Sequence, residues 1–296
     1  MTSVSVVIPA YNAQAQIGET LKALRAQAGI GDFEIVVADN ASTDATAQIA
    51  LDYGAKVVHE STRGPAAARN CGLRAASGEI VAHLDADTVP SRRWLCELVK
   101  AFEDPAAVIA AGRTICYPPK TAAERYVQQI GLYDAALAVK RTPFPFAPSL
   151  NLAVRRRAAF TAGGWNEKLI TGEDVDFSHR IAKTFGTTVQ YCERAVLYHH
   201  ARADDKALVR QARSYGAGVA DLYSMYPDEI EWNARKAFHL AGVIATRAFY
   251  PAAAKIGRRL RLIDDARGEF MRYHWLWTRN FWLGFARRRY AGGGHG

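Results

Sequence analysis

The chain has 296 residues, of which 49% are hydrophobic and 23% are charged, a composition typical of a globular protein with enough apolar residues for a buried core. These values exclude a disordered chain, a collagen and a small disulfide scaffold. The four cysteines, Cys71, Cys96, Cys116 and Cys192, lack CxxC spacing. We therefore expect free thiols in a reducing compartment and no zinc site.

The net charge of +9 lies in the C-terminal part: residues 231–290 contain 13 Lys and Arg against 4 Asp and Glu, whereas residues 1–230 contain 25 of each. Four of the six Trp lie in the same segment. A basic, aromatic segment predicts binding to an anionic membrane surface, with nucleic acid as an unfavoured partner. The residues behind this expectation are Arg258, Arg259, Arg261, the Trp275 to Trp282 cluster and Arg287 to Arg289. The alternative is a set of helices packed on the rest of the chain with a basic outer face.

Short β-branched runs alternate with amphipathic stretches over the first 110 residues, which predicts βαβ units and an α/β fold with a mostly parallel sheet. The expected strands are 4–8, 34–38, 56–59, 79–84 and 107–111. The expected helices are one containing Ile17, Leu21 and Leu24, residues 44–52 capped by Ser42 or Thr43, one starting at Pro65, and residues 92–103 capped by Ser91.

The alternation weakens after Gly112, and a proline-rich patch at Pro143, Pro145 and Pro148 interrupts it. We expect a helix near 121–139, an extended run at 149–154, a helix over 174–185, strands at 188–191 and 195–198, and helices beyond 204. We place a boundary between residues 226 and 227. It separates a catalytic body, residues 1–226, from a helical, basic extension, residues 227–296.

The sequence shows no signal peptide, because the first residues run directly into a β-branched segment. The most apolar stretch of the C-terminal part, residues 237–254, is interrupted by His239, Arg247 and Pro251. It is shorter than the roughly 20 apolar residues that a membrane-spanning helix requires. We therefore expect no transmembrane segment and a cytoplasmic protein, with peripheral binding to the inner face of the cytoplasmic membrane as an extension of that expectation.

Carboxylates follow two strands of the expected sheet. Asp85 and Asp87 come directly after a buried strand, and Asp39 follows another. Ligands of α/β sheets bind at the carboxyl ends of the strands, so these residues should converge. Paired carboxylates suit Mg²⁺ or Mn²⁺ carrying a diphosphate, and Asp39 suits a nucleobase imide or ribose. The alternatives are that one Asp of the D-x-D pair caps a helix and the other is solvated, and that Asp39, Asn40 and Ser42 form an Asx turn that caps the next helix.

Five short motifs occur in a fixed order along the chain: VSVVIPAYN at 4–12, VADNASTD at 37–44, ARNCGL at 68–73, LDAD at 84–87 and GEDVD at 172–176. Together they resemble the motifs of family-2 inverting glycosyltransferases, which have the A-type glycosyltransferase fold. The resemblance implies a Rossmann-like, mostly parallel sheet flanked by helices, and it covers residues 4–218.

This resemblance implies a set of donor-binding residues. Many relatives carry a second Asp where this chain has Asn40, so no charge-dependent role is assigned there. The implied set is Pro9, Tyr11 and Asp39 around the nucleobase, Arg69 near the nucleotide, Asp85 at the ribose or metal, Asp87 at the metal, and His199, with His200 as the alternative, completing the metal site.

The resemblance assigns the catalytic base to Asp174. Inversion requires in-line attack at the anomeric carbon by an acceptor hydroxyl that loses its proton, which a carboxylate can accept. Glu173 is counted with the substrate-binding residues, and Glu173 and Asp176 are candidates for orienting the loop or capping the next helix. The alternative is that all three acids only stabilise the positive end of that helix.

Three further residues complete the candidate substrate site. Trp165 could stack on a sugar ring, with a core role at the Gly163-Gly164 turn as the alternative. Asn151 resembles the polar residue on the acceptor side, and Arg213, with Arg210, resembles a basic helix near the diphosphate, where a solvated face is the alternative.

We therefore expect a metal-dependent, inverting glycosyltransferase that uses a nucleoside diphosphate sugar, with a UDP-sugar as the expected donor and Mg²⁺ or Mn²⁺ as cofactor. Polymer-forming synthases carry Q-x-x-R-W, and this chain has Gln211-Ala212-Arg213-Ser214-Tyr215, so we expect transfer of one sugar to a saccharide or lipid-linked hydroxyl acceptor in cell-envelope glycan synthesis. The alternatives are a nucleotidyltransferase that makes an activated sugar and a non-enzymatic domain that binds membrane or nucleic acid.

Overall fold

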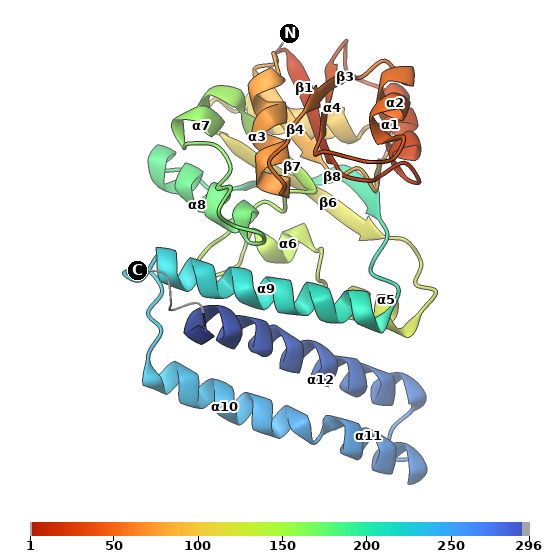
Figure 1. Ribbon diagram of the computed structural model, residues 1–296, viewed down its shortest axis with the longest axis vertical. Coiled ribbons are helices and arrows are strands. Elements are labelled where there is room, and N and C mark those ends of the chain that lie inside the picture. Colours follow the sequence, from red (N-terminus) through yellow and green to blue (C-terminus); the bar gives the residue numbers. More distant parts are fainter. Residues whose placement is uncertain (1, 292–296) are drawn as a thin grey trace. The chain divides into compact units, whose positions relative to one another are not determined.

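The computed structural model describes residues 2–291 (Figure 1). The chain divides into two compact units. The first contains the chain up to Tyr117 together with Tyr133–His200, and the second contains Pro118–Leu132 together with the chain from Ala201 onward. The first unit is an α/β sandwich and the second is helical throughout its described elements.

The first unit is built on a twisted sheet of eight strands in the order β3-β2-β1-β4-β7-β6-β8-β5 within the described residues. Strands β3, β2, β1 and β4 are parallel, β7 is antiparallel to both its neighbours, β6 and β8 are parallel, and β5 is antiparallel to β8. The predicted mostly parallel sheet is therefore confirmed. The strands are β1 (Val4–Ala10), β2 (Glu34–Asp39), β3 (Lys56–His59), β4 (Ile80–Leu84), β5 (Thr88–Pro90), β6 (Ile109–Cys116), β7 (Asn151–Arg155) and β8 (Gln190–His199).

Helices cover the sheet, and this explains why the central strands consist mostly of apolar residues. Every residue of β4 is buried, as expected for a strand covered on both faces. A core cluster that includes Val7, Val81, Leu152 and Phe177 joins the sheet to the helices. The helices of this unit are α1 (Ile17–Arg25), α2 (Thr46–Asp52), α3 (Pro65–Ala75), α4 (Trp94–Val99) with the 3₁₀ turn Lys100–Glu103, α6 (Ala135–Ala138), α7 (Arg156–Thr161) and α8 (Glu173–Phe185).

Two predicted helix caps are wrong. The residue before α2 is Ala45, which has no capping side chain, and Ser42 Oγ instead accepts a hydrogen bond from the Asn12 backbone N–H at 3.0 Å. Helix α4 begins at Trp94 without a side-chain cap, and Ser91 contributes its carbonyl, which accepts from Trp94 N–H at 2.9 Å. Both serines thus accept a hydrogen bond from a backbone N–H group, but neither acts as a side-chain cap of the expected helix. Pro65, by contrast, starts α3 as predicted.

Two predicted segments also differ in extent. The expected helix at 121–139 is interrupted after Gln129, where Gly131 adopts a positive φ of 60°, a conformation that ends helices. The two expected strands at 188–191 and 195–198 form the single strand β8, which accommodates an irregularity opposite Gly112 and Arg113. A β-bulge lets one strand continue through a break in its sequence pattern.

The second unit contains α5 (Ala122–Gln129), α9 (Asp205–Met225), α10 (Ala234–Ala248), α11 (Tyr250–Arg259), α12 (Asp265–Ala286) and the π-helical turn Arg287–Ala291. Helices α9 and α12 approach closely through glycines: a Cβ on Gly216 would lie 1.8 Å from the Phe281 carbonyl oxygen. Among the helices that the structure describes, none is both long enough and apolar enough to cross a bilayer.

Candidate active site

The candidate site of the first unit lies at the carboxyl ends of its parallel strands. Strands β2, β1 and β4 are neighbours, and Ala10 at the end of β1 pairs in register with Asp39 at the end of β2. Asp85 follows β4 directly. The strand order therefore places Tyr11, Asp39 and Asp85 at one edge of the sheet, where α/β folds bind ligands.

Asp39 is a buried carboxylate with one unused oxygen. Its side chain is almost fully covered, its Oδ2 lies 3.2 Å from His59 Nδ1, and its Oδ1 has no hydrogen-bond partner within the described part of the chain. A buried polar atom without a partner is costly unless a ligand supplies one. The Oδ1 atom thus suits a donor such as a nucleobase imide or a ribose hydroxyl.

Asn40 organises the loop next to this carboxylate. Its Nδ2 donates to the carbonyls of Glu60 and Thr62 at 3.1 and 2.7 Å, and its Oδ1 accepts from Gly64 N–H at 2.8 Å. An aspartate could not make the two donations, because an ionised carboxylate only accepts. The chain therefore uses the amide at this position for structure, and its bonds to Glu60, Thr62 and Gly64 are not those of the Asx turn that was the alternative.

The same loop contacts Tyr11 through Arg63. The Arg63 guanidinium lies 3.8 Å from the centre of the Tyr11 ring, and its Nη2 donates to Tyr11 Oη at 2.8 Å. Arg63 Nη1 also donates to the Asn40 carbonyl at 3.1 Å. Tyr11 remains half exposed. Pro9 lies on β1 two residues before it. A cation over an aromatic ring at this edge is a favourable contact that sequence patterns did not reveal.

Arg69 connects two acidic motifs from inside the protein. It lies on α3 and is buried, with Nη2 donating to Asp85 Oδ1 and Nη1 donating to Glu173 Oε1, both at 2.9 Å. The bridge joins the end of β4 to the first turn of α8. This ion pair is not a surface contact, because both the arginine and Glu173 are buried.

The acids at the start of α8 are difficult to ionise. Burial raises the pKa of Glu173 to about 7, although the Arg69 charge opposes the shift. Burial also raises the pKa of Asp174, against the lowering effect of hydrogen bonds from backbone N–H groups. Its Oδ2 accepts from Ser149 N–H at 3.3 Å and its Oδ1 from Val175 N–H at 2.9 Å. A fixed carboxylate with a raised pKa is a suitable proton acceptor near neutral pH.

Asp176, the third acid of the GEDVD motif, binds another side chain of the protein. Asp176 is buried, and its Oδ2 accepts from Nε and Nη2 of Arg180 at 3.0 and 2.7 Å. Arg180 Nη2 also donates to the Gly164 carbonyl at 2.7 Å. Asp176 therefore helps fix the Gly163-Gly164 turn through Arg180.

The metal ligands expected from the sequence come together only in part. His199 Nε2 lies 3.9 Å from Asp87 Oδ2, whereas Asp85 Oδ1 is held by Arg69. In the part of the chain that the structure describes, no three His, Cys, Asp or Glu side chains form a group that could hold a metal ion. Two protein ligands still fit Mg²⁺ or Mn²⁺, because such ions complete their coordination with substrate phosphates and water.

The two histidines at the end of β8 differ in environment. His199 is buried beside the Tyr133 ring, with ring centres 4.6 Å apart, whereas His200 is exposed and stacks on Tyr117 at 4.2 Å. His199 Nε2 is also the ring nitrogen that lies 3.9 Å from Asp87 Oδ2. The geometry therefore favours His199 over His200 as the ligand.

Trp165 belongs to the core. Its side chain is 2% exposed and its ring stacks on Phe177 with the centres 4.2 Å apart. Its backbone N–H and carbonyl both bond to the Asn70 side chain at 2.8 Å. Because its ring is covered, the expected stacking on a sugar is wrong for this arrangement, and the core alternative holds.

Asn151 is also structural. It is fully buried, its Oδ1 accepts from Trp94 Nε1 at 2.8 Å, and its Nδ2 donates to the carbonyls of Arg113 and Ala195 at 3.0 and 3.3 Å. Its hydrogen-bonding groups are therefore directed at protein atoms. The expectation that Asn151 contacts an acceptor is wrong.

Arg213 lies in the second unit, on α9, where its Nε donates to Asn280 Oδ1 at 2.9 Å. Arg213 therefore belongs to a different compact unit from the other candidate residues. Residues that sequence reasoning missed are His59, Arg63 and Asn70. Of these, only Asn70 carries a signal, because it directly follows Arg69 in a motif.

A parallel-strand edge bearing a D-x-D pair and an E-D pair on a helix start is the arrangement of nucleotide-diphospho-sugar transferases with the A-type glycosyltransferase fold. Residues 5–160 match the family described as "Glycosyl transferase family 2". This match covers more than half of the chain, so the chain belongs to glycosyltransferase family 2.

Relatives and a solved structure agree with this assignment. The chain is 31% identical to glycosyltransferase AglE of Haloferax volcanii over 80% of this chain and 78% of that protein. It is 27% identical to the pre-mycofactocin glycosyltransferase of Mycobacterium tuberculosis over 94% of this chain, but spans only 62% of that relative. The fold is shared with mannosyltransferase PcManGT from Pyrobaculum calidifontis in complex with GDP-Man and Mn²⁺, with a TM-score of 0.68 at 21% identity, covering 98% of this chain and 88% of that one.

Proposed function

We propose that this chain transfers one sugar from a nucleoside diphosphate sugar to a hydroxyl acceptor with inversion at the anomeric carbon. The observation that supports this most directly is the Arg69 bridge, which connects the D-x-D segment at Asp85 to the E-D segment at Glu173. A glycosyltransferase needs its donor site and its base in fixed register, because the attack must be in line. Family membership favours transfer over the nucleotidyltransferase and non-enzymatic alternatives.

In the proposed reaction, Asp174 accepts the proton of the acceptor hydroxyl while the oxygen bonds to the anomeric carbon. The bond from that carbon to the diphosphate breaks, and the nucleoside diphosphate leaves. The two backbone N–H groups that bond to Asp174 hold its carboxylate in place. Its raised pKa increases its basicity relative to an exposed aspartate.

The donor would be held by residues on the strand edge. Asp39 Oδ1 would accept from the nucleobase or ribose, with Tyr11 and Pro9 beside it. Asp87 and His199 would hold a Mg²⁺ or Mn²⁺ ion, which when bound would offset the charge of the leaving diphosphate. We propose a UDP-sugar as donor, and include GDP in the test because PcManGT was solved with GDP-Man.

We further propose a saccharide or lipid-linked acceptor in cell-envelope glycan synthesis, reached by peripheral association with the inner face of the cytoplasmic membrane. Transfer of a single sugar is expected because the Q-x-x-R-W motif of polymer-forming synthases is missing at 211–215. The basic second unit supports the membrane-associated acceptor, since cationic helices are attracted to anionic lipids.

The function is tested by a thermal-shift panel of UDP and GDP, each with and without Mn²⁺, because a ligand that binds the folded state raises its stability. We expect a metal-dependent shift with one nucleotide, lost in Asp87→Asn. Transfer should fall on the order of 10²–10⁴-fold in Asp174→Asn, with nucleotide binding retained. The exposed Asp52→Asn on α2 is the matched control. Undiminished turnover in Asp174→Asn, or no shift with either nucleotide, would contradict the proposal.

A further inference from the structure

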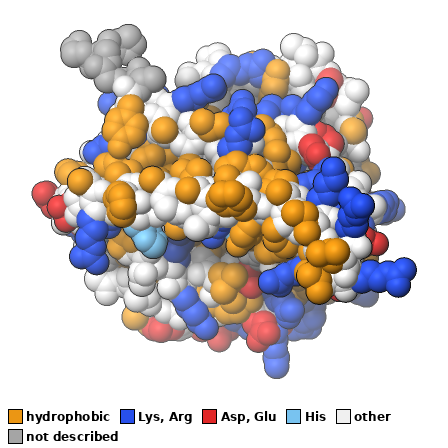
Figure 2. Space-filling model, turned by 90° about the horizontal axis from the view of Figure 1, so that it is seen from below, with side chains coloured by type: hydrophobic (Ala, Val, Ile, Leu, Met, Phe, Trp, Pro, Cys, Tyr) orange, Lys and Arg blue, Asp and Glu red, His pale blue; other side chains and the backbone are white. Residues whose placement is uncertain are grey.

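Helices α10 and α11 carry a long apolar stripe that their own unit does not cover. No residue of α10 is buried. Along the two helices, apolar and small residues recur every three or four positions, which places them on one helical face. All of them are exposed: Phe238, Gly242, Ala245, Phe249, Ala252, Ala253, Ile256 and Leu260. Figure 2 shows a broad band of hydrophobic side chains on this face.

The large members of the stripe are mostly exposed. Phe238 is 83% exposed, Phe249 is 71% exposed and Ile256 is 58% exposed. At 1.5 Å per residue, the stripe from Phe238 to Leu260 extends over roughly 30 Å. A contiguous apolar surface of this length marks an interaction site.

The charges around the stripe specify an anionic partner. Residues 234–261 contain seven Lys and Arg and no Asp or Glu. Helical spacing places Lys255 and Arg259 beside the stripe, and Arg235 borders its first turn. Figure 2 shows Lys and Arg side chains along the border of the hydrophobic band. Apolar residues at the centre with cations at the edge are the pattern of helices that lie in a lipid interface.

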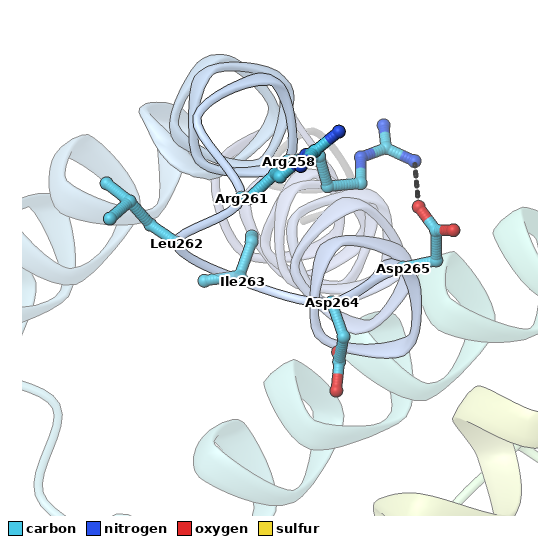
Figure 3. Close-up of a pocket in the computed structure, with 6 residues that line it drawn as sticks. All are labelled: Arg258, Arg261, Leu262, Ile263, Asp264 and Asp265. Carbon is cyan, nitrogen blue, oxygen red and sulfur yellow. Dashed lines mark ion pairs between the residues drawn. The ribbon is translucent and has the colours of Figure 1, made fainter.

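The turn after α11 extends this surface. Arg261 adopts a left-handed conformation with φ of 57°, and Leu262 N–H bonds back to the Gly257 carbonyl at 2.8 Å. Leu262 is thereby left 74% exposed. Figure 3 shows the pocket at this turn, where Leu262 points away from Asp264 and Asp265, and Arg258 pairs with Asp265 at 3.9 Å. The acidic residues are therefore turned away from the apolar side chain.

We infer that the α10–α11 face, defined as Phe238, Phe249, Ile256, Leu260 and Leu262 with their flanking cations, docks on an anionic lipid bilayer. A second copy of this chain is disfavoured, because a symmetric contact would bring two cationic rims together. Nucleic acid is disfavoured because phosphate contacts do not require a stripe of exposed Phe, Ile and Leu. The orientation is in the interface plane, since these helices are unsuited to crossing the bilayer.

Lipid contact was expected from the Trp275 to Trp282 cluster and from Arg287 to Arg289, but several of these residues have partners inside their own unit. The Trp cluster of α12 packs within its own unit: Trp277 lies 6.5 Å from Tyr126, and Trp282 lies 5.3 Å from Phe285, measured between ring centres. Two of the terminal arginines are also engaged, with Arg288 Nε 2.6 Å from Asp221 Oδ1 and Arg289 Nη1 2.6 Å from Ser224 Oγ. The α10–α11 face is the exposed alternative.

As a means of reaching a lipid-linked acceptor, the docking surface rests on the proposed function, but lipid binding itself is measured without catalysis. The test is flotation of the full chain with phosphatidylcholine vesicles that contain either no phosphatidylglycerol or about 30% of it, at about 0.15 M salt. We expect flotation only with the anionic vesicles. The double variant Phe238→Ser and Phe249→Ser should bind at least about tenfold more weakly, because two exposed phenyl groups no longer enter the interface.

The matched control is Phe160→Ser with Phe185→Ser, which removes two exposed phenyl groups from the first unit and should float like the unchanged protein. A thermal shift with nucleotide on the same samples separates failure of docking from failure of the proposed function. No flotation with anionic vesicles, or flotation that is unaffected by the Phe238 and Phe249 substitutions, would overturn the inference. Salt-sensitive RNA binding without flotation would overturn it in favour of nucleic acid. A dimer that is abolished by the same substitutions would overturn it in favour of a second copy of this chain.

Discussion

Replacing Arg69 by methionine should be among the most destabilising single changes in the first unit. The arginine side chain is 4% exposed and neutralises Glu173, which is 9% exposed, and Asp85, which is 33% exposed. Removing one partner of a buried ion pair costs about 3–5 kcal/mol, because the remaining charge stays buried without compensation. The lower end of this range is expected here, since Asp85 reaches water and Glu173 can accept a proton.

The assay is urea unfolding followed by circular dichroism, with Arg74→Met as the matched control. Arg74 lies on the same helix, but its side chain is 57% exposed and its Nη2 lies 3.4 Å from Glu60 Oε2. Surface pairs of this kind contribute about 0–1 kcal/mol. Arg69→Met should therefore lower the free energy of unfolding by at least about 2 kcal/mol more than Arg74→Met, as the difference between these ranges requires.

Two further variants separate charge from volume. Arg69→Lys keeps the charge but cannot present a planar fork to two carboxylates, so it should recover only part of the loss. Adding Glu173→Gln to Arg69→Met removes one of the stranded acids and should restore stability relative to Arg69→Met alone. If Arg69→Met is no more destabilising than Arg74→Met, or if the second substitution gives no recovery, the buried bridge does not hold the two motifs together.

Two more predictions follow from the site. The pKa of Glu173 is about 7 in the folded chain against an ordinary value of 4.5, so the folded state retains a proton that the unfolded state loses, and stability should fall as pH rises from about 4.5 to about 7. Glu173→Gln should flatten this part of the stability profile, measured by urea unfolding across that range, whereas the exposed Glu103→Gln should leave it unchanged; an unaltered slope in Glu173→Gln contradicts the assignment. Asn40→Asp should cost about 1–3 kcal/mol in urea unfolding, because it replaces two hydrogen-bond donations by repulsion from carbonyls. Asn12→Asp is its control, because Asn12 Oδ1 accepts from Thr43 N–H at 2.8 Å and a carboxylate oxygen can accept the same bond. Equal losses in the two variants would refute the role of the Asn40 amide.

The sheet could be predicted because short runs of β-branched residues, separated by amphipathic stretches, fit buried strands better than helices. Strand β3 has the expected bounds, and β1, β2 and β4 differ from expectation by one or two residues. The strand β8 was expected as two pieces, because Glu193 and Arg194 interrupt its apolar pattern. The backbone continues there by means of an irregularity opposite Gly112. Sequence periodicity has no sign for such a bulge.

The motifs predicted correctly that acidic residues lie in one site, but the contacts of single polar or aromatic residues were predicted poorly. Asp85 and Glu173 were expected in one site, and the structure joins them through Arg69. Trp165 and Asn151 were expected to face a substrate, yet one stacks on Phe177 and the other bonds to Trp94. Whether a tryptophan or asparagine faces a ligand or the core depends on side-chain direction and on neighbours distant in sequence. The spacing of residues in a motif gives no information about side-chain direction or about such neighbours.

The charge of the C-terminal part shows how packing changes the meaning of composition. Several cations of the second unit are paired within that unit: Arg125 pairs with Glu269 at 2.7 Å, Arg272 lies 3.5 Å from Asp205, and Arg288 pairs with Asp221. Such pairs join helices α5, α9 and α12 and the turn after α12. Because these cations are neutralised by acids of the same unit, they contribute little electrostatic attraction to an external anionic partner. The segment 234–261 has no acidic residue of its own, and its apolar stripe is exposed. The cations that matter for a lipid surface are therefore those of α10 and α11, whereas the Trp275 to Trp282 cluster lies on α12.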